Sequence, residues 1–147
     1  MKIAVASDHA GFELKRELLE VLNLRKLAVH DVGTFSNDAV DYPDFATEVA
    51  GAVSGGKVDF GVLVCGTGIG MSIVANKYKG VRAALCHTEF EARMSRAHND
   101  ANILCIGSRV TGPGLARVVL EAFLNTKFEG GRHERRVQKI RDAEGGR

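Results

Sequence analysis

The residues Asp59–Gly70, with the sequence DFGVLVCGTGIG, constrain the fold of this chain more than any other stretch. The apolar run Phe60–Cys65 has the length and composition of a buried strand, and the glycine-rich turn after it leads into a helix expected over Met71–Tyr78. A strand, a glycine turn and a helix N-terminus together form an anion site, because free backbone N–H groups and the helix dipole converge there. Glycine spacing of this kind is common, so a turn that merely lets the helix pack stays open as the alternative.

Cys65 lies where the predicted strand meets the glycine turn. A helix N-terminus favours the thiolate form of a nearby thiol, and a thiolate can act as a base or a nucleophile. The alternative is a core cysteine that ends a strand. Three cysteines without a CxxC pair indicate neither a disulfide framework nor a zinc site, so we expect Cys86 and Cys105 in the core and a reducing, cytoplasmic environment.

Apolar strands alternate with amphipathic helices along the chain, a pattern that predicts a parallel sheet covered by helices on both faces. The expected strands span residues 3–7, 27–32, 60–65, 81–86 and 102–106, and the helices between them begin near residues 12, 43, 71, 88 and 113. We therefore expect one domain over residues 1–147, an α/β fold built as a three-layer α/β/α sandwich with a five-stranded parallel sheet. A polar, arginine-rich helix should end the chain as an arm that is either solvated or laid on a partner subunit.

The apolar pattern also assigns faces to the helices. In the first helix the leucines form the inner stripe and Lys15 falls on the polar face. Thr88 and Glu91 form a capping box at the start of the fourth helix, where Phe90 and Met94 belong to the predicted inner face.

Several polar residues follow the carboxyl ends of predicted strands: Asp8, His9, the turn Cys65–Gly70, and Arg109. The carboxyl ends of parallel strands meet at one edge of a sheet, and ligands of open α/β sheets bind there. The alternative is that Asp8 caps a helix and His9 is a surface residue.

A second set of polar residues does not belong to that edge. His98 and Asn99 precede the last strand, so within one chain they should lie at the opposite edge, and only a second subunit could bring them to Cys65. Arg132 and Arg136 are four residues apart on one helix face, a spacing that suits a phosphate clamp or, alternatively, a solvated face.

The composition disfavours two classes of partner. A net charge of +2, with 26% charged and 45% hydrophobic residues, argues for neither nucleic acid nor a membrane surface. No apolar run approaches the ~20 residues that a transmembrane helix needs. The arginine-rich end also lacks the interleaved aromatic residues typical of nucleic-acid binding.

Seven motifs occur together and in order: DHAGF at Asp8–Phe12, DYP at Asp41–Pro43, CGTGIG at Cys65–Gly70, ANK at Ala75–Lys77, SRAHNDAN at Ser95–Asn102, GSR at Gly107–Arg109 and EGGRHERRV at Glu129–Val137. Over essentially all of its length, the chain resembles the sugar-phosphate isomerase family that contains type B ribose-5-phosphate isomerases and the galactose-6-phosphate isomerase subunits. The resemblance implies a Rossmann-like sheet and an aldose–ketose isomerase that interconverts D-ribose 5-phosphate and D-ribulose 5-phosphate through a cis-enediolate.

The resemblance also implies roles for individual residues. Cys65 matches the family's base; members with another residue there use a glutamate further along the loop, a region that reads Gly70-Met71-Ser72 here. His98 matches the acid that opens the sugar ring, and Thr67 would move a proton between O1 and O2. The implied anion hole is the backbone of Gly66, Thr67, Gly68, Ile69 and Gly70.

The remaining implied contacts orient and hold the sugar phosphate. Asp8 and Asn99 would orient sugar hydroxyl groups, and the resemblance also implies that Asp8 is one of the catalytic residues. The implied phosphate ligands are His9, Arg132 and Arg136, assisted by Arg109. His30, His87 and His133 receive no role.

The resemblance implies a homodimer that shares its site between subunits, with a tetramer of paired dimers as a further level of assembly, and no metal or organic cofactor. Two alternatives stay open: a six-carbon substrate such as allose 6-phosphate or galactose 6-phosphate, and a non-catalytic phosphate- or nucleotide-binding module.

Overall fold

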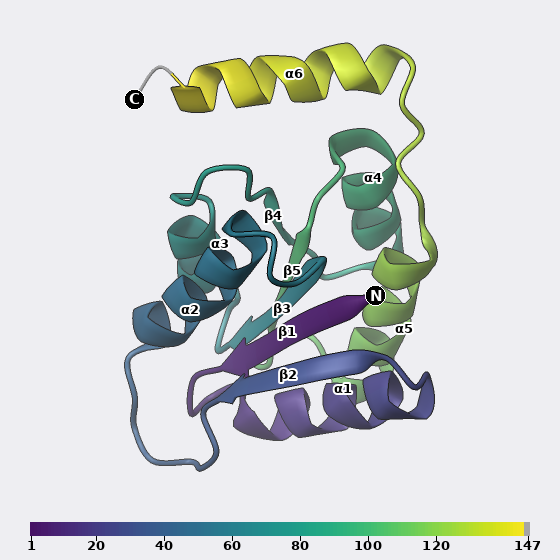
Figure 1. Cartoon of the computed structure of the whole chain (residues 1–147). Helices are drawn as coiled ribbons and strands as arrows, with labels where there is room; N and C mark the ends of the chain where they lie inside the picture. The colour runs from purple at the N-terminus through teal and green to yellow at the C-terminus, as the bar shows by residue number, and fades with distance from the viewer. Residues whose placement is uncertain (146–147) are drawn as a thin grey trace.

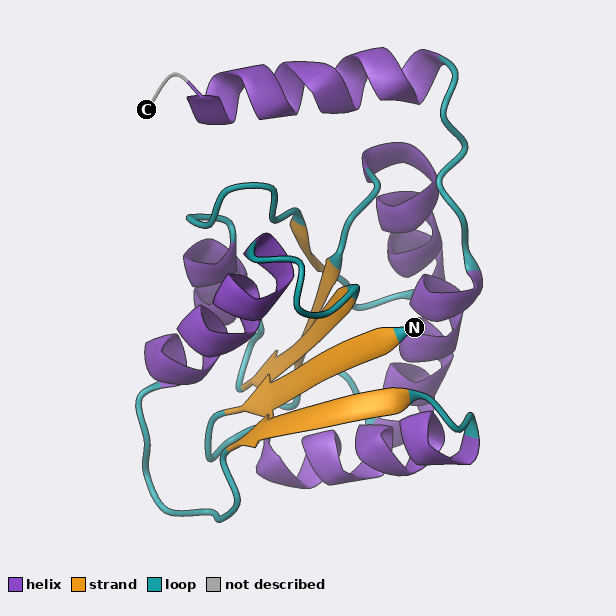
Figure 2. Ribbon diagram, in the orientation of Figure 1, coloured by secondary structure: helices purple, strands orange, loops and turns teal. Residues whose placement is uncertain are grey.

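The computed structural model describes residues 1–145 and places a parallel five-stranded sheet between two layers of helices (Figures 1 and 2). The elements are β1 Lys2–Ser7, α1 Phe12–Leu24, β2 Ala28–Gly33, α2 Tyr42–Ser54, β3 Phe60–Cys65, α3 Ile69–Ala75, β4 Ala83–Leu85, α4 Glu89–Asn99, β5 Ile103–Gly107, α5 Pro113–Asn125 and α6 Arg132–Gly145. The strand order is β2-β1-β3-β5-β4, and every pair is parallel. The predicted α/β/α sandwich is therefore confirmed.

The two faces of the sheet bury separate hydrophobic cores. Along β3, Val62 and Val64 pack with α1, α4 and α5, whereas Leu63 and Cys65 pack with α2 and α3. Successive side chains of a strand point to opposite faces, so a strand covered on both sides must be apolar throughout. This placement aims the Cys65 side chain at the α2–α3 face.

Two elements differ from their predicted bounds by more than one residue. Helix α3 begins at Ile69 and ends at Ala75, so Ile69 and Gly70 belong to its first turn and not to the preceding loop. Strand β4 has only three residues and pairs with β5 alone. The Asn102 side chain, not a strand partner, accepts the hydrogen bond from Arg82 N.

Two face assignments were wrong. Lys15 is 1% exposed, because its ammonium group is paired with the Asp31 carboxylate beneath the Phe35 ring. Phe90 is 68% exposed, and α4 instead buries Arg96, whose guanidinium lies over aromatic rings of the core. An amphipathic pattern counts such charged residues as outward-facing because it does not record their partners.

The polar helix α6 lies across one end of the molecule, away from the sheet (Figure 1). Its first turns bury His133 and Val137 next to α4, and near its end Glu144 accepts a hydrogen bond from Gly80 N at 2.8 Å. A groove of about 790 Å³ runs between these attachments, lined in part by Arg82 and Ile140. Within residues 1–145, no helix is long and apolar enough to cross a membrane.

Candidate active site

The glycine turn after β3 is pressed against the end of β5. Gly68 adopts φ +76°, and a Cβ there would lie 2.5 Å from Leu85 and 3.0 Å from the Ile106 carbonyl carbon. A Cβ on Gly107 would lie 2.6 Å from the Thr67 oxygen. Only glycine allows both the left-handed backbone and this close approach, so the turn is held rigidly at the carboxyl edge of the sheet.

The Cys65 sulfur faces the backbone of this turn. Its side chain is 4% exposed, and Sγ accepts a hydrogen bond from Gly68 N at 3.1 Å. Burial raises the pKa of Cys86 to about 11 and the pKa of Cys105 well above its ordinary value, so both remain neutral thiols at physiological pH. Of the three free cysteines, Cys65 is the one whose sulfur receives a backbone N–H at a strand end.

Three further side chains surround the turn. Thr67 is exposed, and its hydroxyl accepts a hydrogen bond from Ile69 N at 3.3 Å. The Arg109 guanidinium packs over Gly66, while Arg109 N donates to the Gly66 oxygen at 3.0 Å. The Tyr42 ring covers Gly70, where a Cβ would lie 2.6 Å from it.

Tyr42 received no role from the sequence, although it is the central residue of the DYP motif. Its ring closes one side of the glycine turn because α2 begins at this edge. The motif marked the position, but the spacing of residues in α2 did not reveal which element the ring would contact.

Asp8 and His9 follow β1 at the same edge. Asp8 is 7% exposed, and its Oδ1 accepts a hydrogen bond from Gly11 N at 3.0 Å, so the carboxylate also shapes the turn into α1. The Nδ1 atom of His9 accepts from Val40 N at 3.2 Å, which leaves Nε2 to carry the proton of the neutral ring. His9 can therefore donate a hydrogen bond from Nε2.

The second set of predicted residues lies at the opposite edge, as the chain order requires. His98 and Asn99 end α4, and Arg132 and Arg136 occupy the first turns of α6. The six residues of β3 separate this edge from Cys65 by roughly 17 Å or more. A single chain therefore carries two groups of candidate site residues that it does not bring together, which we call the glycine-turn half and the histidine half.

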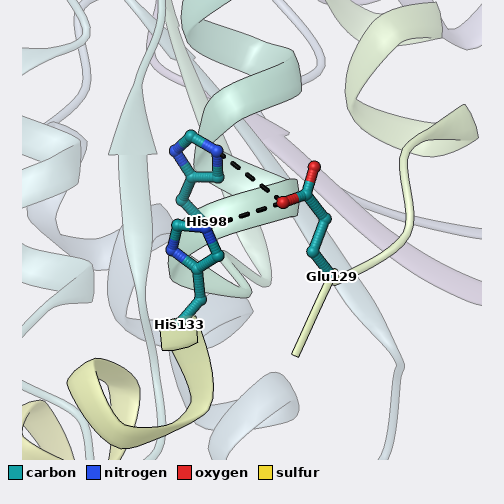
Figure 3. Close-up of side chains that lie close together, drawn as sticks. All are labelled: His98, Glu129 and His133. Atoms are coloured by element: carbon teal, nitrogen blue, oxygen red, sulfur yellow. Dashed lines mark ion pairs between the residues drawn. The ribbon is translucent and has the colours of Figure 1, made fainter. Parts of the chain in front are cut away.

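The histidine half contains a cluster that the sequence did not reveal (Figure 3). The rings of His98 and His133 are stacked, with centroids 4.1 Å apart and planes inclined by 7°. Glu129 Oε2 lies 3.9 Å from His98 Nε2 and 3.5 Å from His133 Nε2. Arg132 Nε donates a hydrogen bond to His133 Nε2 at 3.4 Å.

His133 is buried, whereas His98 is about one-third exposed. Burial lowers the pKa of His133, and the neighbouring His98, Arg132 and Arg136 lower it further, against the opposing effect of Glu129. His133 is thus a neutral ring at pH 7. No sequence pattern signalled this contact, because it joins residues of two helices 35 positions apart.

The end of α4 is fixed by a partly buried ion-pair network. Arg96 Nη1 lies 2.9 Å from Asp100 Oδ1 and donates to the Ala101 oxygen at 2.6 Å, and Arg82 Nη2 lies 2.9 Å from Asp100 Oδ2. These contacts hold Asp100 in a left-handed conformation that ends the helix. This fixed helix end determines the positions of His98 and Asn99. The SRAHNDAN motif contains Arg96 and Asp100, but neither was assigned a role from the sequence.

The ligand atoms of His98, Glu129 and His133 lie within 4.8 Å of one another, a spacing that a divalent transition metal could use. The Arg132 guanidinium at His133 Nε2 opposes this, since it occupies the lone pair and adds a positive charge. The cluster therefore fits hydrogen bonding and ring stacking better than metal coordination.

Comparisons with known proteins give a consistent result. Residues 3–140 match the family described as Ribose/Galactose Isomerase. The chain is 50% identical to ribose-5-phosphate isomerase B of Escherichia coli strain K12 over 139 residues, which cover 95% of this chain and 93% of that protein.

Solved structures agree. The ribose-5-phosphate isomerase B of Clostridium thermocellum superposes with a TM-score of 0.98 at 51% identity, over 99% of both chains. The ribose-5-phosphate isomerase B of Mycoplasma genitalium, solved with bound ribulose-5-phosphate, gives a TM-score of 0.95 at 42% identity, over 99% of this chain and 97% of that one.

Proposed function

The chain belongs to the ribose/galactose isomerase family, and from this premise we propose that it interconverts D-ribose 5-phosphate and D-ribulose 5-phosphate. The observation that carries the proposal is the similarity to type B isomerases along nearly the full length of the chain, one of which was solved with bound ribulose-5-phosphate. The geometry at Cys65 supports the chemistry, because isomerisation needs a base beside an anion-stabilising backbone.

In the proposed reaction, the Cys65 thiolate removes the proton from C2 of the open-chain aldose. The electron pair of that bond forms the C1–C2 double bond, and the carbonyl electrons move to O1, giving a cis-enediolate. Return of the proton to C1, with transfer of a proton from O2 to O1, completes the ketose. The Gly68 N–H that contacts Cys65 Sγ stabilises the thiolate, and N–H groups of the turn stabilise the enediolate oxygen.

His98 acts before this step, on the closed sugar. It donates a proton to the ring oxygen while solvent water takes the C1 hydroxyl proton, so the bond between C1 and the ring oxygen breaks and the aldehyde forms. Glu129 Oε2 lies 3.9 Å from His98 Nε2. Asp8 and Asn99 orient the sugar hydroxyls.

The phosphate requires several donors. We assign this role to His9 through Nε2, to Arg132 and Arg136 through their guanidinium groups, and to Arg109 in support. Arg109 already lies over the glycine turn, and Arg132 and Arg136 share the exposed side of α6.

A homodimer would join the two half-sites, because each chain supplies both. Ile69 and Ile73, four residues apart on α3, are each about half exposed beside the glycine turn, and the groove under α6 adds a second open surface. A second copy of the chain would cover such apolar surface. Pairing of dimers into a tetramer is the further possibility, and light scattering after gel filtration measures which assembly forms.

The test of the activity is conversion of ribose 5-phosphate to ribulose 5-phosphate without added metal, for the wild type and for Cys65→Ala. We expect a fast wild type and a folded variant slower by about 10³-fold. Allose 6-phosphate and galactose 6-phosphate, run beside it, test the six-carbon alternative. A wild type that binds ribose 5-phosphate without turnover would support the non-catalytic binding module instead.

The three free thiols are consistent with our proposal of a cytoplasmic enzyme.

A further inference from the structure

We propose that His133 is a positioning residue that fixes the ring-opening His98 and the phosphate-binding Arg132 relative to each other. The inference rests on the proposed function, and it deepens it by linking the two chemical tasks of the histidine half. The evidence is the stacking of His133 on His98 and its hydrogen bond to Arg132 (Figure 3).

The stack fixes the plane of His98. His98 lies in the last turn of α4 and its side chain is about one-third exposed, so the helix backbone alone leaves several rotamers open to the ring. His133 is 5% exposed in its side chain and presents a flat face 4.1 Å away. The buried His133 ring restricts the partly exposed His98 ring to orientations parallel to it. Because His133 is neutral, it does not repel His98 when that ring carries a proton.

The hydrogen bond fixes Arg132. Its Nε–H is donated to His133 Nε2, so the neutral His133 ring must carry its proton on Nδ1. With Nε engaged, the guanidinium keeps its paired Nη groups for a bidentate contact with phosphate oxygens. An exposed arginine thereby gains a preferred orientation, which reduces the entropy lost when the phosphate binds.

The backbone joins the two helices at the same place. Glu129 N donates to the Ala97 oxygen at 3.0 Å, directly before His98, and the Glu129 carboxylate faces both imidazoles. The backbone bond therefore ties the segment just before α6 to the end of α4, so the ring-opening group and the phosphate ligand are positioned by the same contact.

Two substitutions separate the two contacts of His133. His133→Phe keeps a flat ring over His98 but has no acceptor for Arg132. His133→Gln places an amide oxygen near the Nε2 position, but it has no ring. We expect His133→Phe to raise KM for ribose 5-phosphate about tenfold with kcat within about threefold, and His133→Gln to lower kcat about tenfold with KM within about threefold. Val137→Ala, at the other buried side chain of α6, is the matched control and should change neither constant more than about threefold.

Ring opening itself can be measured in a Cys65→Ala background, where we expect isomerisation to be about 10³-fold slower. Magnetisation transfer between the α and β anomers of ribose 5-phosphate then reports enzyme-promoted opening and reclosure. Cys65→Ala and Cys65→Ala/His133→Phe should accelerate this exchange, and Cys65→Ala/His133→Gln should not. The inference would be overturned if all three variants accelerated the exchange between anomers equally, or if none of them accelerated it.

The kinetic comparison distinguishes a failure of the proposed function from a failure of the positioning role. A wild type without isomerase activity means that the proposed function is wrong. If the wild type is active but His133→Phe and His133→Gln change kcat and KM in the same proportion as each other, His133 merely supports α6 and the positioning role is wrong. The same holds if both variants change these constants only as much as Val137→Ala does.

Discussion

The glycine-turn half and the histidine half of the proposed site are built in different ways. The first consists largely of backbone, with the turn at Cys65 pressed between β5 and the Tyr42 ring. The second consists of side chains from α4 and α6, held by stacking and ion pairs at a partly exposed surface. A half made of backbone is positioned by the sheet alone, whereas a half made of side chains depends on every contact that orders them.

The sharpest test of this division is complementation between two inactive variants. Cys65→Ala lacks the proposed base of one half, and His98→Ala lacks the proposed acid of the other, so each variant, as the proposed homodimer, should lose about 100-fold or more of its activity. If the halves meet across a dimer, a heterodimer of the two variants contains one intact site. Random reassociation of equal amounts should restore about a quarter of wild-type activity, since half of the dimers are mixed and one of their two sites works.

The measurement is kcat after mild denaturation and refolding of the mixture, with each variant refolded alone as the control. A mixture that stays as inactive as its components would show that both halves act within one chain, against the placement of His98 and Cys65 at opposite sheet edges.

The rigidity of the glycine-turn half predicts the next largest effect. Gly68→Ala must accommodate a left-handed backbone and a Cβ 2.5 Å from Leu85, so we expect a loss of roughly 3 kcal/mol in the free energy of unfolding and at least a tenfold loss of kcat/KM. Gly80 has the same backbone conformation, φ +75°, with open space around it. Gly80→Ala is thus the matched control. It should lose roughly 1 kcal/mol in the free energy of unfolding and keep wild-type activity. Urea unfolding and kinetics on both variants check this, and equal effects would contradict it.

The histidine half should instead respond to pH. The pKa of His133 in the folded protein lies below the value of 6.5 expected for the unfolded chain, so the unfolded chain binds more protons as the pH falls below 6.5. The free energy of unfolding should therefore decrease as the pH falls through this range, and it should decrease less in His133→Gln than in the wild type. Urea unfolding at pH 7.5 and pH 5.5 measures the difference. A steeper dependence in His133→Gln than in the wild type would contradict the lowered pKa.

The same contrast explains how much the sequence could predict. The bounds of β3 could be predicted from its apolar run, because a strand that is buried on both faces consists of apolar residues throughout. The opposite-edge placement of His98 followed from chain order alone. The contact of His98 with His133 did not, since residue spacing describes one helix at a time and the stack joins two. Lys15 was misplaced for a related reason, because its burial depends on Asp31, a partner in another element.

Helix α4 connects the two halves, and its first turn gives the smallest predicted effect. The Thr88 hydroxyl accepts from Glu91 N at 3.2 Å, and Glu91 Oε2 accepts from His87 N and Thr88 N, which lowers the pKa of Glu91. Thr88→Ala should cost about 1 kcal/mol of unfolding free energy at pH 7. Because the folded pKa is the lower one, the contribution of Glu91 is present above pH 4.5 and is lost as the pH falls below it.

Activity should not follow this loss of stability. The last turn of α4 is fixed independently by Arg96 and Asp100, so a frayed first turn leaves His98 in place, and kcat and KM of Thr88→Ala should remain within twofold of the wild type (roughly 0.4 kcal/mol). Asp100→Asn weakens the network at the other end, and it should lower kcat several-fold for a comparable loss of stability. If Thr88→Ala lowers kcat as much as Asp100→Asn, α4 transmits disorder along its length, and the two halves are not positioned independently.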